Sequence, residues 1–326
     1  MPDVADNISP LSADGPAPPV TQDLAQKWLG KLFSNSLHRP WFQRMLRPIV
    51  RYAIWNHASG ILDGPGANAR WLLGEESTDD ERRRFAMDVV MNFLDFVNAM
   101  GSSLHQSKDH IYERIDKVTG VDAWHEARSA KRGAIMVTAH MGCFEIALAG
   151  ICKHEKHVHV VFQHDDYDDF NTLRAKQRQR WGAIDAPIGE DFSVWMRLRD
   201  ALNDDHIVLI QGDRVMPGQH GIDMPFAGGH IAMPTGPVKL ALAAGSPIIP
   251  AFALFRGSRF SGTVDIHMEK PIHPQPGPVN ENHPAMKEIT AAIEQRVLAD
   301  PDQWYTLYRA FREDMAPGRS SGDSEK

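Results

Sequence analysis

Two residues with acid–base side chains, His140 and Glu145, lie in the segment Thr138-Ala-His-Met-Gly-Cys-Phe-Glu145. The apolar run 134–139 predicts a buried strand that ends just before the histidine, and residues 144–151 predict a helix. A histidine in such a turn lies at the exposed edge of an open α/β sheet. There Glu145 can fold back to hydrogen-bond one ring nitrogen of His140, which leaves the other nitrogen free to take a proton.

A histidine–carboxylate pair of this kind predicts a general base. It suits the attack of a hydroxyl group on a thioester, because the histidine removes the hydroxyl proton as the new bond forms. The carboxylate then stabilises the imidazolium. This chemistry requires no acyl-enzyme. The spacing alone is not specific, and it is the position at the end of a strand that favours a catalytic role.

The composition indicates a globular protein. Of 326 residues, 42% are hydrophobic and 24% are charged. The net charge of −7 argues against a protein that coats nucleic acid with its whole surface, so we expect no nucleic-acid partner. The two cysteines, Cys143 and Cys152, are too few for a disulfide framework or a zinc-type cysteine pairing, and they are consistent with a reducing cytoplasm.

The chain reads as one domain between two polar ends. Residues 1–20 are acidic and rich in proline, without the apolar stretch of a signal peptide, and predict a disordered leader. Residues 316–326 predict a disordered tail. Residues 21–315 form the expected single domain. Because no stretch of about 18 apolar residues occurs, we expect a soluble or peripheral protein.

The stretch 41–55 predicts a basic amphipathic helix. Apolar residues recur at helical spacing, while Arg44, Arg47 and Arg51 share another face, with Arg39 just before them. One interpretation is a membrane-surface helix whose arginines meet lipid headgroups. The other is an ordinary surface helix that packs its apolar face on the core. The pattern leaves both open.

The rest of the pattern predicts an α/β fold, with a mixed sheet flanked by helices and a helical N-terminal lead-in. The acidic residues 77–81 predict the start of a long helix. Further strands are predicted at 158–162, 206–210 and 248–255, and helices near 168–181, 191–202, 237–244 and 283–299.

Several segments together resemble one protein family. The segment His140-Met-Gly-Cys-Phe-Glu145 resembles the His-x-x-x-x-(Asp/Glu) signature of the lysophospholipid acyltransferase superfamily. Gly212-Asp-Arg214, Met224-Pro-Phe-Ala-Gly-Gly229 and the block from Met233 to Pro250 resemble later blocks of the lipid A late acyltransferases and the phosphatidylinositol mannoside acyltransferases. The similarity extends from about Trp41 to about Ala310, and the ordered combination is more specific than any one block.

The resemblance implies a glycerolipid-acyltransferase-like fold and an O-acyltransferase that moves a fatty acyl group from an acyl thioester to a hydroxyl of a membrane glycolipid, such as a lipid A precursor. The donor would be an acyl carrier protein or coenzyme A thioester. No cofactor or metal is implied. The protein would be peripheral, at the cytoplasmic face of the inner membrane.

By position in these blocks, His140 would be the general base and Glu145 its orienting partner. Asp213 and Arg214 would lie near the polar head of a substrate, where Arg214 could bind phosphate. The family also carries arginines on the preceding helix, in the region of Arg174, Arg178 and Arg180, so the resemblance makes Arg178 and Arg180 further substrate-binding candidates; the alternative is that these arginines form a solvated helix face.

Thr235 and Gly236 precede an apolar helix, so their backbone amides could meet an anionic headgroup or the reacting oxyanion. The alternative is that Thr235 is merely an N-cap. The chain also departs from the lipid A branch. It has no N-terminal spanning helix and reads Cys143-Phe144 where that branch commonly reads Asn-Trp, which bears on the acceptor rather than on the reaction type.

Three other hypotheses stay open. Cys143 lies inside the motif, so a cysteine nucleophile activated by His140 would give thioesterase-like chemistry through an acyl-enzyme. A second hypothesis is metal-dependent hydrolysis, with ligands drawn from His154, His157, His159, His164, Asp165 and Asp166. The third is an inactive lipid-binding protein with this fold, which the presence of both His140 and Glu145 disfavours.

Overall fold

The structure is a computed structural model. It describes residues 40–57, 59–163, 168–189, 192–216, 219–257 and 262–314. The predicted leader (1–20) and tail (316–326) lie outside these residues. None of the described helices is long and apolar enough to cross a membrane.

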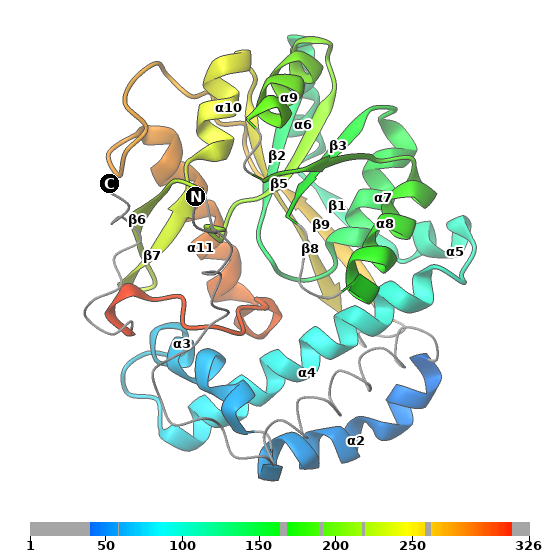
Figure 1. Cartoon of the computed structure of the whole chain (residues 1–326), viewed down its shortest axis with the longest axis vertical. Coiled ribbons are helices and arrows are strands. Elements are labelled where there is room, and N and C mark those ends of the chain that lie inside the picture. Colours follow the sequence, from blue (N-terminus) through cyan, green and yellow to red (C-terminus); the bar gives the residue numbers. More distant parts are fainter. Residues whose placement is uncertain are drawn as a thin grey trace, which may run out of the picture.

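A seven-stranded sheet forms the centre of the molecule, in the order β1-β9-β8-β2-β5-β3-β4 (Figure 1). Its strands are β1 (Ile115–Thr119), β2 (Ala134–Thr138), β3 (Val158–Phe162), β4 (Ile184–Pro187), β5 (Ile207–Gln211), β8 (Ile248–Arg256) and β9 (Thr263–Met268). All neighbours pair in parallel except β8 and β9, which are antiparallel. The mixed sheet predicted from the sequence is confirmed.

The central strand β2 is buried on both faces, as its uninterrupted apolar sequence predicts. Ala134 and Met136 contribute to one core, and Ile135 and Val137 to the other, because side chains alternate along a strand. The first core also contains residues of α6 (Val121–Ser129), α7 (Phe144–His154) and α8 (Asp168–Trp181). The second contains residues of α9 (Ser193–Asn203), α10 (Gly236–Ala244) and α11 (Pro284–Ala299).

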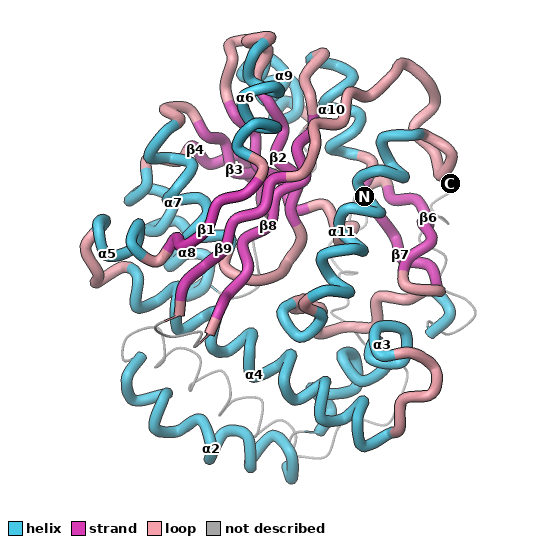
Figure 2. Tube along the Cα trace, turned by 180° about the vertical axis from the view of Figure 1, so that it is seen from behind, coloured by secondary structure: helices cyan, strands magenta, loops and turns pink. Residues whose placement is uncertain are grey.

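A two-stranded antiparallel sheet of β6 (Gly221–Phe226) and β7 (Gly229–Pro234) lies beside α11 and joins the second core. Short helices complete the chain: α5 (Lys108–Glu113), η2 (Pro301–Gln303) and η3 (Arg312–Asp314). Figure 2 shows the small sheet set apart from the central one, with α11 between them.

The helical lead-in consists of α2 (Pro40–His57), η1 (Ser59–Leu62), α3 (Asp63–Leu73) and α4 (Asp79–Ser103). The predicted acidic helix start is confirmed and forms a capping box: Thr78 N donates to Glu81 Oε2 at 2.8 Å, and Glu81 N donates to Thr78 Oγ1 at 3.3 Å. Figures 1 and 2 both show α2 at the outer edge of the molecule, along α4.

The helix predicted at 41–55 exists, and its two described arginines form ion pairs with α4. Arg47 pairs with Asp95 of α4, with Nη2 3.0 Å from Oδ2, and Arg51 pairs with Asp88, with Nη1 3.0 Å from Oδ1. These arginines therefore link α2 to α4, with side chains that remain partly exposed. The side chains of Arg39 and Arg44 lie outside the described part of the structure.

Candidate active site

The turn that carries His140 follows β2 and is held from two sides. Cys143 N donates to Ala253 O of β8 at 2.8 Å, and Tyr305 N donates to His140 O at 2.8 Å. Gly142 has a φ of +60°, and a Cβ at this position would lie 1.8 Å from Ala253 O, so the turn requires glycine. Distant parts of the chain therefore fix the position of His140.

Asp213 is the carboxylate that binds His140. Its Oδ1 lies 2.7 Å from Nδ1 of the ring, and its Oδ2 accepts a hydrogen bond from the backbone N–H of His140 at 3.0 Å. Trp304 donates its indole N–H to the same Oδ2 at 2.8 Å. The side chain of Asp213 is 2% exposed and that of His140 is 26% exposed, so the carboxylate is enclosed while the ring reaches the surface of a pocket.

The charge state of Asp213 determines what the ring can do. Burial would raise the pKa of this carboxyl, but the charge and hydrogen bond of His140, with help from Arg214 and Trp304, outweigh burial and lower the pKa to about 2. An ionised carboxylate only accepts hydrogen bonds, so Nδ1 of His140 carries a proton. Nε2 is then the ring nitrogen available to accept a proton from a substrate.

Glu145 does not make the contact expected of it. Neither ring nitrogen of His140 is hydrogen-bonded to Glu145 in the described structure, and Nδ1 belongs to Asp213. The Glu145 side chain is buried and its Oε2 has no hydrogen-bond partner among the described residues. Burial raises the pKa of Glu145 to about 8, an effect that nearby Arg174 and Arg178 reduce. The geometric reason is that α7 begins at Phe144 and places Glu145 inside the protein.

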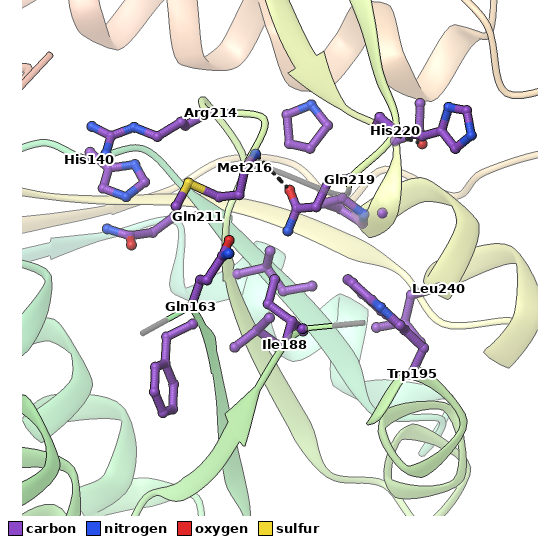
Figure 3. Close-up of a pocket in the computed structure, with 18 of the residues that line it drawn as sticks. His140, Gln163, Ile188, Trp195, Gln211, Arg214, Met216, Gln219, His220 and Leu240 are labelled. Carbon is purple, nitrogen blue, oxygen red and sulfur yellow. Dashed lines mark hydrogen bonds between the residues drawn. The ribbon is translucent and has the colours of Figure 1, made fainter. Parts of the chain in front are cut away.

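The His140 ring lines a pocket of about 960 Å³. Arg214 and Gln211 lie on the His140 side of it, and Trp195 and Leu240 on the opposite side (Figure 3). The opposite side is built by α9 and α10 and is mostly apolar, with Arg199 and Lys239 on the same helices; its apolar lining residues are Phe192, Trp195, Met196, Leu240 and Ala243. A polar end beside a catalytic group and an apolar end fit a ligand with a reactive head and a hydrocarbon chain.

The charged residues that line the pocket are cationic. They are Arg174, Arg199, Arg214 and Lys239, and no aspartate or glutamate occurs among the described lining residues. Arg214 follows Asp213 directly, and its guanidinium lies 4.8 Å from the centre of the Tyr308 ring. Its Nε is buried without a hydrogen-bond partner among the described residues. Such an arrangement favours an anionic ligand group at the His140 end.

Arg178 and Arg180, predicted as substrate-binding residues, do not line this pocket. Arg178 is buried, pairs with Asp185 at 2.6 Å and lies 3.8 Å from the centre of the Phe162 ring. Arg180 donates to the backbone carbonyls of Ser103 and Gln106. Both therefore join α8 to neighbouring elements, and it is Arg174, one turn earlier on α8, that reaches the pocket.

Thr235 and Gly236 do line the pocket, at the start of α10. Thr235 occupies the N-cap position, but its side chain makes no capping hydrogen bond and donates instead to His220 O at 3.2 Å. Gly236 faces Trp195: a Cβ on the glycine would lie 3.0 Å from the indole ring. The small residue thus allows Trp195 to pack against the helix start.

Gln211 is a pocket residue that the sequence interpretation missed. It is the last residue of β5 and pairs with Thr138 of the neighbouring strand β2, and Thr138 lies two residues before His140. Its Nε2 is buried and has no hydrogen-bond partner among the described residues. A buried amide donor without a partner is costly. At a pocket beside His140, it is a candidate for binding a ligand oxygen.

Cys143, the alternative nucleophile, is 1% exposed and does not line the pocket. Burial raises its pKa to about 12, so the thiolate needed for attack does not form at neutral pH. The geometry disfavours a cysteine mechanism.

The described histidines of the metal hypothesis, His154, His157 and His159, lie near the amino ends of the strands, whereas His140 follows the carboxyl end of β2. His157 and His206 stack with ring centres 4.4 Å apart, and His159 Nε2 lies 3.0 Å from His206 Nδ1. No group of ligand-type residues that could hold a metal ion occurs in the described structure. His164, Asp165 and Asp166 lie outside the described residues.

Residues 301–311, called here the C-terminal strap, form a wall of the pocket through Tyr305, Leu307 and Tyr308. Asn68 of α3 holds the strap: its Nδ2 donates to Tyr308 O at 2.8 Å, and its Oδ1 accepts from Ala310 N at 3.0 Å. A run of aromatic residues beyond the last predicted helix was the available sequence signal for this wall. The strap, which includes Trp304, thus completes the site with residues that lie far from His140 in the sequence.

Comparison with known proteins gives a consistent result. A family model described as "Bacterial lipid A biosynthesis acyltransferase" matches residues 40–313. The phosphatidylinositol mannoside acyltransferase of Mycolicibacterium smegmatis is 22% identical over 212 residues, which are 64% of this chain and 66% of that protein. That of Mycobacterium tuberculosis (strain H37Rv) is 22% identical over 209 residues, 63% of each chain. The chain thus spans just under two thirds of the length of these relatives.

Proposed function

Because the chain belongs to the bacterial lipid A biosynthesis acyltransferase family, we propose that it transfers a fatty acyl group from a thioester to a hydroxyl of a membrane glycolipid, with His140 as the general base. The observation that carries the proposal is the Asp213–His140 pair at the polar end of a pocket whose other end is mostly apolar. Family membership supports the acyltransferase activity, and the site geometry supports His140 as the base.

The base step follows from the ring orientation. Asp213 keeps the proton on Nδ1, so Nε2 of His140 takes the proton of the acceptor hydroxyl while its oxygen attacks the thioester carbonyl carbon. The imidazolium that forms is stabilised by the Asp213 carboxylate. When the tetrahedral intermediate collapses, the C–S bond breaks, and the leaving sulfur receives the proton from Nε2. The enzyme returns to its starting state without an acyl-enzyme.

The intermediate carries a negative oxygen that needs hydrogen-bond donors. We assign this role to the Gln211 amide, whose Nε2 lacks a partner in the described structure. Gln211 lies on the His140 side of the pocket (Figure 3). Removing one such donor typically lowers kcat by roughly 10²–10³-fold.

The pocket supports a lipid acceptor with an anionic group. Arg214 lines the His140 end (Figure 3), and no carboxylate occurs among the described lining residues, which favours a phosphate there. The apolar end between α9 and α10 suits the acyl chain of the donor. A lipid A precursor is the acceptor we propose first. A phosphatidylinositol mannoside, which the names of the relatives indicate for those proteins, is the second. The site of action we propose is the cytoplasmic face of the inner membrane, with the protein peripheral.

The direct test is transfer by the purified protein. Acyl carrier protein and coenzyme A thioesters of the same chain length are each offered with a lipid A precursor or a phosphatidylinositol mannoside, and the acceptor mass is measured. We expect one acyl mass to be added by the parent protein and none by His140→Ala. Cys143→Ser should transfer normally, and no acyl group should remain on the protein. Full activity of His140→Ala would contradict the proposed mechanism.

A further inference from the structure

The exposed face of α2 carries no charge over most of its length. Between Met45 and Asn56, the residues classed as exposed are Met45, Pro48, Ile49, Tyr52 and Asn56. They follow the i, i+3, i+4, i+7 spacing of a single helix face. Met45 is 70% exposed, Ile49 62% and Tyr52 66%, and these are among the most exposed large apolar side chains of the described structure.

The two arginines of this helix whose side chains are described, Arg47 and Arg51, pair with α4. Arg47 forms two hydrogen bonds to Asp95, at 3.0 and 3.4 Å, and Arg51 forms one to Asp88 at 3.0 Å. Asp95 is 6% exposed at its side chain, so the first of these pairs lies partly inside the protein. An ordinary surface helix buries its apolar face and exposes its charges. In α2, Arg47 and Arg51 bind carboxylates of α4, and an apolar stripe of Met45, Ile49 and Tyr52 is exposed to solvent.

The inner side of α2 connects to the pocket. Ile54 is fully buried in a cluster with Met87 and Val90 of α4, and Leu307 of the C-terminal strap packs against that cluster. Leu307 also lines the pocket. The helix that carries the apolar stripe is thus packed on the same elements that form the pocket wall.

We propose that the apolar stripe docks on a lipid bilayer surface and holds the enzyme there while the acceptor enters the pocket. Two apolar side chains and a tyrosine suit the interface between acyl chains and headgroups, where an aromatic ring with a polar hydroxyl is favoured. The inference rests on the proposed function, because that function takes a membrane lipid as acceptor. It replaces the arginine-mediated binding that the sequence suggested with insertion of apolar side chains.

The size of the stripe argues for a lipid surface over a second copy of the chain. Three side chains, each about two-thirds exposed, offer on the order of 300–400 Å², whereas a stable protein interface buries about 800 Å² per partner. A bilayer requires no complementary partner surface, so a narrow stripe on a helix at the outer edge of the molecule is sufficient.

Vesicle binding tests the inference. The full-length variant Met45→Ser/Ile49→Ser/Tyr52→Ser is compared with the parent by cosedimentation with vesicles of phosphatidylethanolamine and phosphatidylglycerol. A matched control, Val118→Ser/Val121→Ser/Leu298→Ser, removes three apolar side chains that are 42–45% exposed elsewhere. We expect the stripe variant to bind roughly tenfold or more weakly and the control to bind as the parent. The binding of the parent should change little between low and high salt, because apolar insertion is not screened.

Two results would overturn the inference. One is a stripe variant that sediments with vesicles as the parent does. The other is a parent that is dimeric by light scattering and becomes monomeric on substitution, which would make the stripe an interface between copies. Circular dichroism and thermal unfolding verify that the variant is folded, and Tyr52→Phe, which keeps the ring, should bind nearly as the parent.

A comparison of acceptor forms separates this inference from the proposed function. With acceptor lipid dispersed in detergent, the stripe variant should keep the activity of the parent, and with acceptor in vesicles it should lose activity in proportion to binding. If the parent transfers no acyl group to any acceptor but still binds vesicles through the stripe, the proposed function fails and the docking inference stands. If activity on vesicles is equal in parent and stripe variant, the docking inference fails alone.

Discussion

Trp304 donates its indole N–H to Oδ2 of Asp213 at 2.8 Å, and both side chains are buried. The other oxygen of this carboxylate binds Nδ1 of His140. The indole therefore limits rotation of the carboxylate and helps to keep it ionised. The Trp304 indole holds the Asp213 carboxylate, and the carboxylate holds the His140 ring, so the ring has little freedom to leave its orientation in the site.

Trp304→Phe should lower kcat by about tenfold with little change in KM, because a hydrogen bond to a charged group contributes about 1.5–3 kcal/mol and acts here through His140. The pKa of Asp213 should also rise from about 2. A carboxyl group whose pKa is lower in the folded than in the unfolded state stabilises the fold at a pH above its unfolded pKa, and this stabilisation is lost as the pH falls. Because the substitution makes that difference in pKa smaller, the variant should lose less stability than the parent between about pH 4 and 2.

The matched control for this variant is Trp181→Phe, which removes a buried indole hydrogen bond to Gln177 at 3.2 Å, away from the pocket. It should alter stability without changing kcat. Steady-state kinetics and urea unfolding at several pH values provide both measurements. Equal kcat in Trp304→Phe and parent would exclude a positioning role for the indole.

Asp213→Asn should reduce kcat by roughly 10²–10⁴-fold, because an amide can donate to Nδ1 and favour the wrong tautomer of the imidazole. The isosteric change keeps the volume of the buried side chain. Transfer assays under saturating donor and acceptor measure the effect. A loss smaller than that of Glu145→Gln would return the orienting role to Glu145.

Glu145→Gln should change the pH dependence of stability more than it changes catalysis. The pKa of Glu145 is raised from 4.5 to about 8, so the folded state holds a proton that the unfolded state has released in this interval. Stability of the parent therefore falls as pH rises from about 4.5 through 8, by on the order of a few kcal/mol. The glutamine variant lacks this slope, and urea unfolding at pH 5, 6.5 and 8 will detect the difference. Parallel pH profiles would show that Glu145 is ionised when buried.

The elements that sequence alone predicted are those with continuous apolar patterns. Strands β2, β3, β5 and β8 and helices α7 to α11 were expected, and the structure differs from the expected bounds by a few residues at most. Strands β1, β4, β6, β7 and β9 were missed. Of these, β1 and β4 are the edge strands of the central sheet, and their sequences, Ile115-Asp-Lys-Val-Thr and Ile184-Asp-Ala-Pro, lack a continuous apolar run because most residues of an edge strand stay exposed.

The site was predicted in part for a similar reason. His140 and Arg214 follow strands that the apolar pattern reveals, and both line the pocket. The contact between His140 and Asp213 joins positions 73 residues apart, and that from Trp304 to Asp213 joins positions 91 apart. Such contacts depend on the order of strands in the sheet and on the path of the C-terminal strap. Local spacing pointed to Glu145, which is close in sequence but lies inside the protein.

Arg214→Gln should raise KM for a phosphate-bearing acceptor by about tenfold and leave KM for the acyl donor nearly unchanged, since the guanidinium lines the His140 end of the pocket. Arg178→Gln serves as the comparison, because Arg178 is bound to Asp185 outside the pocket. It should lower the melting temperature and leave both KM values as they are. If Arg178→Gln raises the acceptor KM and Arg214→Gln does not, α8 and not Arg214 binds the headgroup.

Arg47→Gln/Arg51→Gln tests whether the arginines of α2 serve the fold or a membrane. In the structure Arg47 and Arg51 face the carboxylates of Asp95 and Asp88, at 3.0 Å in each case. The Arg51 pair is about half exposed, so it contributes at most ~1 kcal/mol, and the Arg47 pair contributes more because Asp95 is nearly buried.

The double variant should therefore unfold at a lower temperature, yet bind anionic vesicles within about twofold of the parent at temperatures where it is folded. Asp88→Asn removes one of these pairs while taking away a negative charge, and it should shift unfolding in the same direction. Arginines that met headgroups directly would give another pattern: at low salt the double variant would bind anionic vesicles roughly thirtyfold more weakly than the parent, because each charge contributes about 1 kcal/mol, and its binding to neutral vesicles would change little. Cosedimentation at two salt concentrations, set beside thermal unfolding of the same samples, separates a helix fastened by its charges from one that uses them on the bilayer.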